Sequence, residues 1–182
     1  MYFKAFHAEF EKIARLQTRS LTIVGEQKIP KGDYAFLPMY CKDKKCDCRR
    51  TLINVLQVTP EYGPFHAATI SYGWEPLDFY RDWAKALSEE EIKIMKGPAL
   101  DHFNTQSPSA SHLLESFVNL VLDDDYSERL KRQYAMFKYK IGMKLPPDLE
   151  KQADLSGECP CGSGRPFKLC CGRGKFSRRY RR

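Results

Sequence analysis

The spacing of hydrophobic and polar positions changes twice along the chain. Among the first 20 residues, five apolar side chains recur at helical spacing between charged residues: Phe3, Phe6, Phe10, Ile13 and Leu16. Such a stripe is typical of an amphipathic helix that packs on a core. Four runs rich in β-branched and aromatic residues follow, over 20–24, 33–40, 51–58 and 66–74. Their composition and the short gaps between them predict a small, mainly antiparallel sheet.

After Pro76 the pattern returns to helical spacing. Apolar residues predict helices over 77–87, 88–96, 107–124 and 126–144. Ser88 and Glu91 form a capping box at the start of the second of these helices, and Gly97-Pro98 ends it. We expect Ser107 to cap the third helix, with Pro108 at its first position, and Asp125 to cap the fourth. The sequence therefore predicts an α+β fold with an N-terminal helix, a small sheet and C-terminal helices.

Composition bounds the organisation of the chain. Its 182 residues are enough for one compact domain plus an appendage. We expect an α+β domain over 1–144, a polar, proline-rich linker over 145–158, and a metal knuckle and a basic tail after it. No stretch is long and apolar enough to predict a membrane span, and the N-terminus does not read as a signal peptide. We therefore expect a cytoplasmic protein whose thiols stay reduced.

Four of the seven cysteines lie within 13 residues near the C-terminus: Cys159, Cys161, Cys170 and Cys171. Four thiolates at this spacing can complete a tetrahedral shell around one ion without help from the rest of the fold. The Gly162-Ser163-Gly164 segment lets the chain turn back between the two pairs. Arg165 and Lys168 offset the excess negative charge. In a reducing compartment the cluster predicts a metal site, with zinc the expected ion and iron an alternative.

The segment "CPCGSGRPFKLCC" resembles the SEC-C motif, the metal knuckle at the C-terminus of the SecA translocase and of many small bacterial proteins. The fourth ligand is Cys171, where many members carry histidine. The resemblance implies a docking module for a chaperone or the ribosome over 159–174. Residues 18–140 also resemble bacterial proteins that carry this motif, without bringing an activity. No phosphate-binding loop of the SecA motor is present in the sequence.

A second group of thiols lies between two predicted strands. Cys41, Cys46 and Cys48 sit at a hairpin tip, where three sulfurs can surround one ion. His66, Asp43 or Asp47 can complete the shell, or water can, which is the arrangement of a catalytic site. The alternative is three structural or surface cysteines without a metal.

Charge is concentrated at the C-terminus. The chain carries a net +7, yet residues 159–182 hold eight basic residues and no acid, so residues 1–158 sum to −1. Such a run indicates an anionic partner, most often nucleic acid, although it can also be a solvated tail. Aromatic residues between the terminal arginines suit base stacking. The candidate nucleic-acid-binding residues are Arg165, Lys168, Arg173, Lys175, Phe176, Arg178, Arg179, Tyr180, Arg181 and Arg182.

Three functional hypotheses follow. The leading one is a non-enzymatic metal-binding protein that docks on RNA or the ribosome through its knuckle and the basic tail, residues 175–182. The second is a docking adaptor for a chaperone or secretion protein, as the SEC-C resemblance implies. The third is a metalloenzyme that uses an open coordination position at Cys41, Cys46 and Cys48.

Overall fold

The computed structural model describes residues 3–25, 28–59 and 63–173. The expected basic tail, residues 175–182, lies outside the described residues. The described chain is an α+β protein built on one antiparallel sheet, as the sequence predicted. None of its described helices combines the length and the apolar character that crossing a membrane requires.

All strand pairs of the sheet are antiparallel, and the strand order is β1-β3-β4-β5-β6, with β2 also paired to β3. β1 and β2 therefore share one edge of β3: β1 pairs with its C-terminal end and β2 with its N-terminal half. The bounds are β1 Phe3–Ala5, β2 Arg19–Ile23, β3 Gly32–Cys41, β4 Arg50–Thr59, β5 Gly63–Gly73 and β6 Ala99–Leu100. The four predicted strands correspond to β2 through β5.

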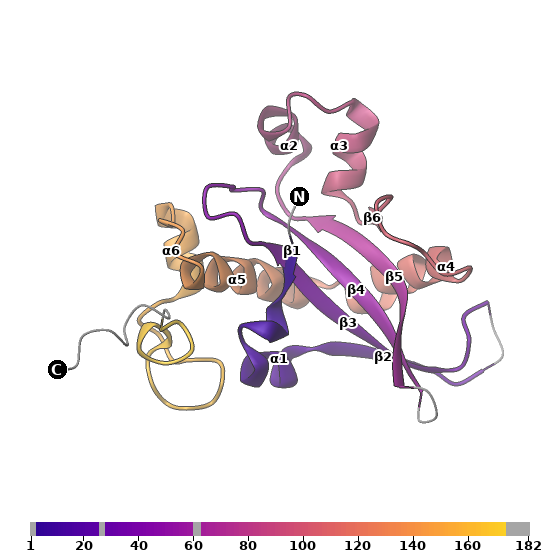
Figure 1. The fold of residues 1–182 in the computed structure, drawn as a ribbon, viewed down its shortest axis with the longest axis horizontal. Coiled ribbons are helices and arrows are strands. Elements are labelled where there is room, and N and C mark those ends of the chain that lie inside the picture. Colours follow the sequence, from indigo (N-terminus) through magenta and orange to yellow (C-terminus); the bar gives the residue numbers. More distant parts are fainter. Residues whose placement is uncertain (1–2, 26–27, 60–62, 174–182) are drawn as a thin grey trace.

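Helices cover the sheet and one of its ends (Figure 1). The π-helical turn η2 follows α4 directly, and both pack on the sheet together with α5, whereas α2 and α3 stand at the top of Figure 1. The bounds are α1 Glu11–Gln17, α2 Leu77–Trp83, α3 Glu89–Lys96, α4 Ala110–Ser116, η2 Phe117–Val121, α5 Asp124–Lys140 and α6 Pro147–Ala153, with 3-10 turns η1 at Phe6–Ala8 and η3 at Phe167–Leu169.

The N-terminal helix is shorter than the apolar spacing predicted. Residues 3–5 form β1 because their backbone pairs with Met39 to Cys41, and the α-helix begins only at Glu11. Phe10 and Ile13 are buried as expected, whereas Leu16 is 67% exposed. A tertiary pairing with a distant strand therefore overrides the local helical pattern at the start of the chain.

The helix ends differ in detail from the sequence prediction. Ser88 and Glu91 form the expected capping box. Ser107 is not the cap of α4, since its N–H donates to the Ala67 carbonyl of β5 and the helix begins after Ser109. Asp123, rather than Asp125, caps α5 by accepting from the backbone N–H of Tyr126. In both corrected cases the capping position follows from where the preceding chain attaches to the sheet.

The segment expected to be a linker contains the helix α6. Its Leu149 and Ala153 are buried in the same hydrophobic cluster as Phe10 and Phe167. These two apolar residues lie four positions apart among polar ones, which is enough for one buried stripe on a two-turn helix. The chain between the sheet domain and the C-terminal cysteines is thus packed on the body and is not an extended tether.

Candidate metal centres

The C-terminal cysteines lie on a compact turn, which we call the knuckle (residues 159–173 as described). The Cys159 N–H donates to the Arg165 carbonyl at 2.8 Å, so the chain closes a small hairpin between them. Gly162 and Gly164 have φ values of 75° and 67°, which a glycine adopts at little cost. The turn η3 follows and returns the second cysteine pair toward the first.

The four knuckle sulfurs, Sγ of Cys159, Cys161, Cys170 and Cys171, all lie within 4.8 Å of one another. The Cys161 and Cys170 Sγ atoms are 3.6 Å apart. A tetrahedral ion with metal–sulfur bonds of about 2.3 Å needs sulfur–sulfur edges of about 3.8 Å. The side chains are therefore gathered at close to the spacing that a tetrahedral thiolate site requires, and the residues fit zinc.

The surroundings of the knuckle cysteines shift their pKa values in different directions. The Ser163 hydroxyl, as a hydrogen-bond donor, lowers the pKa of Cys161 to about 6. Burial raises the pKa of Cys159 and of Cys171. Cys161 thus ionises more readily than Cys159 and Cys171, and a bound cation would favour the loss of the protons of those two thiols.

The knuckle is attached to the body by two contacts. Phe167 is fully buried, and its ring centroid lies 5.9 Å from that of Phe10 and 6.2 Å from that of Tyr139. The Lys140 ammonium, in the last turn of α5, donates to the carbonyls of Cys171 at 2.6 Å and Arg173 at 2.5 Å. The helix therefore holds the knuckle backbone beside the second cysteine pair.

The three thiols of the second group come together where β3 joins β4: Cys41 ends β3, and the other two lie in the connection, which we call the hairpin loop (residues 42–49). The Sγ atoms of Cys41, Cys46 and Cys48 all lie within 4.8 Å of one another. Cys41 and Cys48 are buried and Cys46 is partly exposed. Hydrogen bonds from Cys46 and Cys48 hold the pKa of Cys41 far below its usual value, and the shared protons raise the pKa of those two thiols.

Helix α5 also holds the hairpin loop. Lys138 is fully buried, and its ammonium donates to the carbonyls of Asp43 at 2.9 Å and Cys46 at 2.7 Å. Residues two apart on a helix point to opposite sides. Lys138 and Lys140 therefore face opposite ways, and Figure 1 shows α5 running between the hairpin loop above it and the knuckle below it. The sequence analysis missed both lysines, because nothing local distinguishes them from solvated residues of an amphipathic helix.

The fourth ligands proposed for the hairpin loop have other partners. His66 lies on β5 opposite Leu56, and its Nε2 is 2.8 Å from the Thr69 hydroxyl. The Asp47 carboxylate accepts from Tyr134 and Arg49, and Asp43 Oδ1 accepts from the Lys45 N–H. Among the described residues, no histidine or carboxylate joins the three sulfurs. The described part of the chain thus brings three thiols together here.

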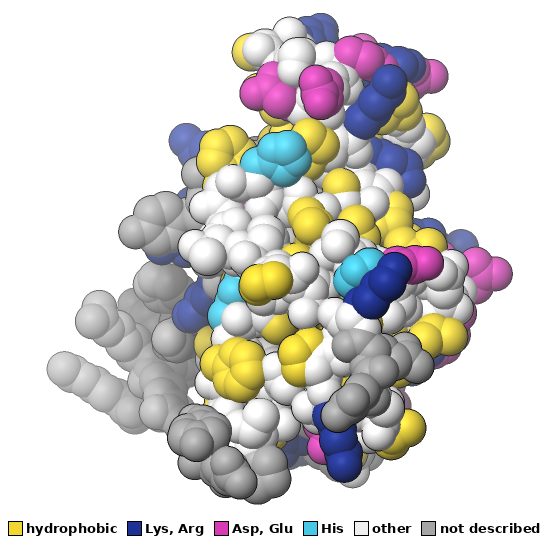
Figure 2. Space-filling model, turned by 90° about the vertical axis from the view of Figure 1, so that its right-hand side faces the viewer, with side chains coloured by type: hydrophobic (Ala, Val, Ile, Leu, Met, Phe, Trp, Pro, Cys, Tyr) yellow, Lys and Arg dark blue, Asp and Glu magenta, His cyan; other side chains and the backbone are white. Residues whose placement is uncertain are grey.

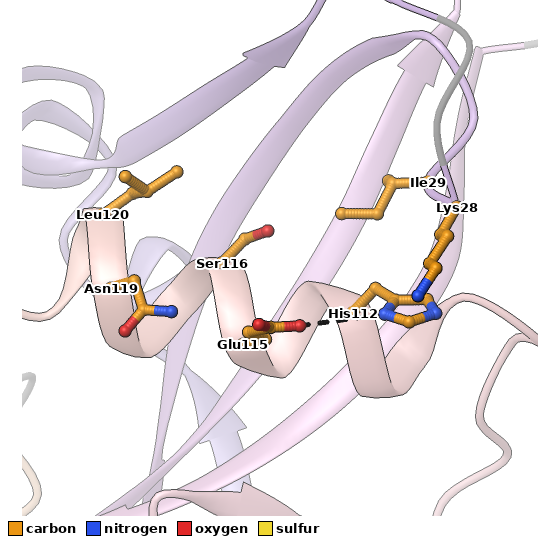
Figure 3. Close-up of a pocket in the computed structure, with 7 residues that line it drawn as sticks. All are labelled: Lys28, Ile29, His112, Glu115, Ser116, Asn119 and Leu120. Atoms are coloured by element: carbon orange, nitrogen blue, oxygen red, sulfur yellow. Dashed lines mark ion pairs between the residues drawn. The ribbon is translucent and has the colours of Figure 1, made fainter.

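A surface hollow away from the cysteines brings fewer candidate metal ligands together. Figure 3 shows His112, Glu115 and Asn119 on one side of it and Lys28 on the other, with His112 Nδ1 3.8 Å from a Glu115 oxygen. The face shown in Figure 2 carries scattered hydrophobic side chains, and its charged groups gather mainly at the top, over α2 and α3. The single histidine in the hollow thus lies near one exposed carboxylate and is not part of a cluster of candidate metal ligands among the described residues.

Three of the proposed nucleic-acid-binding residues are described. Arg165, Lys168 and Arg173 are exposed around the knuckle, and Lys168 Nζ is 3.1 Å from the Ser156 hydroxyl. The other seven lie outside the described residues: Lys175, Phe176, Arg178, Arg179, Tyr180, Arg181 and Arg182. The described members of the proposed nucleic-acid-binding set are thus all exposed at the knuckle.

Comparisons with known proteins relate the chain to SecA and the knuckle to the SEC-C motif. The chain is 27% identical over 104 residues to the protein translocase subunit SecA of Campylobacter curvus (strain 525.92), an alignment that spans 57% of this chain and 11% of that protein. The chain therefore spans about a tenth of the length of this curated relative. No solved structure matches the chain. The family model for the SEC-C motif matches residues 158–173, so the knuckle is a SEC-C motif, and its four cysteines converge.

Proposed function

We propose that this chain is a non-enzymatic, zinc-binding docking protein of the cytoplasm that binds RNA, with the ribosome as its target, through the knuckle and the basic tail. The observation that carries the proposal is the knuckle itself: four convergent thiols surrounded by the exposed cations Arg165, Lys168 and Arg173. A closed four-thiolate ion is a poor catalyst and a good structural anchor. It fixes a cationic surface in place, which suits recognition of a polyanion.

Each cysteine cluster is proposed to hold one ion. The knuckle has the full sulfur set of a structural zinc site. The hairpin loop has three sulfurs, and the buried ammonium of Lys138 contributes a compensating positive charge beside them. Zinc suits both thiolate-rich sets, and iron is the alternative ion.

RNA fits the charge distribution better than a membrane surface or a small anion. The tail alternates arginine with Phe176 and Tyr180, a pattern that combines phosphate contacts with base stacking. The knuckle cations Arg165, Lys168 and Arg173 extend the same positive run into the described part of the chain. If about five of these charges meet phosphates of single-stranded RNA, the slope of log K against log salt is about −3.5.

The test is a salt titration of binding to purified ribosomes and to total cellular RNA, with the full-length metal-loaded protein. Removing residues 175–182 should flatten most of the salt slope and leave the metal content intact. Replacing Arg165, Lys168 and Arg173 with glutamine should flatten it further. The matched control replaces three exposed lysines of the body, Lys12, Lys85 and Lys93, with glutamine and removes the same charge. Unchanged affinity and slope after truncation would refute RNA docking.

The likeness to SecA favours a second candidate, a docking adaptor for a secretion or chaperone partner. The two candidates separate in one experiment. Protein purified from native cells with and without nuclease should lose its partner on nuclease treatment if RNA is the target, and should keep it if the partner is a protein.

A further inference from the structure

A cavity of about 530 Å³ lies away from the knuckle and from the face of Figure 3. Its walls come from β1, the start of β4, helix α3 and the segment after β6, near the end of the sheet where α2 and α3 stand in Figure 1. Phe3, Leu52, Ile94 and Met95 form an apolar lining. The volume falls in the range of pockets that bind small organic molecules.

One cation, Arg50, lies buried in this lining. Its side chain is only 6% exposed. Nη2 donates to the Ser71 hydroxyl at 3.0 Å, while Nε is buried without a hydrogen-bond partner. No ion pair joins Arg50 to a carboxylate within the described part of the chain. A guanidinium has five donors, and leaving a buried one such as Nε unused in an apolar setting is costly unless an acceptor takes it.

The acidic groups around the cavity are already engaged. Asp101 is 5% exposed, and its Oδ2 accepts from the N–H of Phe103 and from the Asn104 amide at 2.5 Å. The Glu91 carboxylate belongs to the capping box of α3. Neither carboxylate forms an ion pair with Arg50 in the described structure. Asp101 and, when ionised, the thiols of Cys41 and Cys48 still attract the guanidinium, and this negative surrounding disfavours a ligand that carries more than one negative charge.

The apolar surface continues from the lining to the rim. The Phe3 ring centroid lies 5.7 Å from Arg50 Cζ, so the guanidinium is stacked against an aromatic ring. At the other side, Phe103 is 97% exposed. A ligand that places its charge on Arg50 thus meets apolar groups along the rest of its length.

We propose that this cavity binds a small monocarboxylate with an apolar body, whose carboxylate pairs with Arg50 and whose hydrocarbon part contacts Phe3, Leu52 and Ile94. The planar fork of a guanidinium matches a carboxylate in a bidentate pair. The proposal is independent of docking by the knuckle, because the cavity shares no residue with it.

The test is isothermal titration calorimetry of the full-length, metal-loaded protein with octanoate. Three control ligands each change one feature of octanoate. Octanol lacks the negative charge, acetate lacks the apolar body, and inorganic phosphate carries more negative charge than a monocarboxylate. We expect one octanoate to bind per chain, and each of the other three probes to bind at least tenfold more weakly. No heat with octanoate, or equal affinity for phosphate or octanol, would overturn the proposal.

Two variants locate the site. Arg50→Met removes the charge, and Ile94→Trp keeps Arg50 but fills the cavity. Each should weaken octanoate binding at least tenfold. Leu120→Trp, on the exposed wall of the hollow in Figure 3, is the matched control and should bind octanoate like the unmodified protein. If Arg50→Met is too unstable to measure, Ile94→Trp alone decides: unchanged octanoate affinity in that folded variant would place the binding elsewhere and refute the assignment.

Discussion

Replacing Lys138 with methionine should weaken metal binding in the hairpin loop without affecting the knuckle. Its buried ammonium donates to two carbonyls of the loop, those of Asp43 and Cys46. Three thiolates with a divalent ion carry a net charge of −1, and Lys138 neutralises it at a site where water is largely excluded. Methionine has a similar length and keeps the apolar contacts of the side chain, but it leaves both carbonyls without a partner.

The size of the effect follows from these contacts. A hydrogen bond from a charged group contributes about 1.5–3 kcal/mol, so two give about 3–6 kcal/mol. Part of this loss is offset, because the variant no longer buries an ammonium group, and burying a charge costs several kcal/mol. A net loss of about 2–4 kcal/mol of binding free energy remains. At about 1.4 kcal/mol per tenfold change, this corresponds to a dissociation constant raised roughly 30- to 700-fold.

Lys140→Met is the matched control, because the two lysines lie in the same helical turn and make the same kind of contact with different loops. Lys140 donates to the carbonyls of Cys171 and Arg173 in the knuckle. We expect Lys138→Met to release the hairpin ion and Lys140→Met to release the knuckle ion. Lys140 is partly exposed, so its effect should be smaller, since surface interactions are screened by solvent.

The assay is competition with a chromophoric chelator, which resolves the two ions by affinity. Cys46→Ser and Cys161→Ser assign each phase to its site. Thermal unfolding of each variant checks that the body remains folded. If Lys138→Met releases both ions to the same degree, or neither, the assignment of Lys138 to the hairpin loop alone is refuted.

Further predictions concern the two cysteine clusters and the capping box of α3. Elemental analysis should find two ions per chain, and one in Cys46→Ser or in Cys161→Ser; one ion in the unmodified protein, unchanged in Cys46→Ser, would eliminate the hairpin site. Acidification should release the metal, because protons compete for the thiolates and Cys161, with a pKa of about 6, is protonated below that pH; release that is independent of pH between 7 and 4, followed with the same chelator, would contradict thiolate ligation. Ser88→Ala should lower the free energy of unfolding by about 1 kcal/mol through loss of the capping box, and an unchanged urea midpoint would contradict it.

The sequence predicted those parts of the structure whose causes are local. The strands β3 to β5 follow from composition and turn residues, and the capping box of α3 from two residues three apart. The convergence of the knuckle cysteines was predictable as well, because 13 residues with flexible glycines can close on themselves. The three hairpin thiols converge for the same reason, since a tight β3–β4 connection brings them together.

The remaining features depend on contacts between distant segments. β1 is three residues long and exists only because β3 offers it an edge. α6 looks like a polar linker until Leu149 and Ala153 meet a core that the sequence does not locate. The roles of Lys138 and Lys140 depend on where α5 ends relative to two loops. The burial of Arg50 likewise depends on how α3 closes over the start of β4.

The knuckle packs on the sheet domain, so an ion bound in the knuckle would affect the stability of both. A knuckle on a flexible linker would fold or unfold without consequence for the sheet domain. Here Cys159 and Phe167 are buried in the same cluster as Phe10 and Leu149. Burial of a phenylalanine side chain contributes about 1.5–3 kcal/mol, so unfolding of the knuckle removes a comparable amount from the stability of the body. An ion bound at the knuckle would therefore stabilise the body as well as its own loop, and a partner that binds the knuckle would contact a surface fixed to the sheet domain.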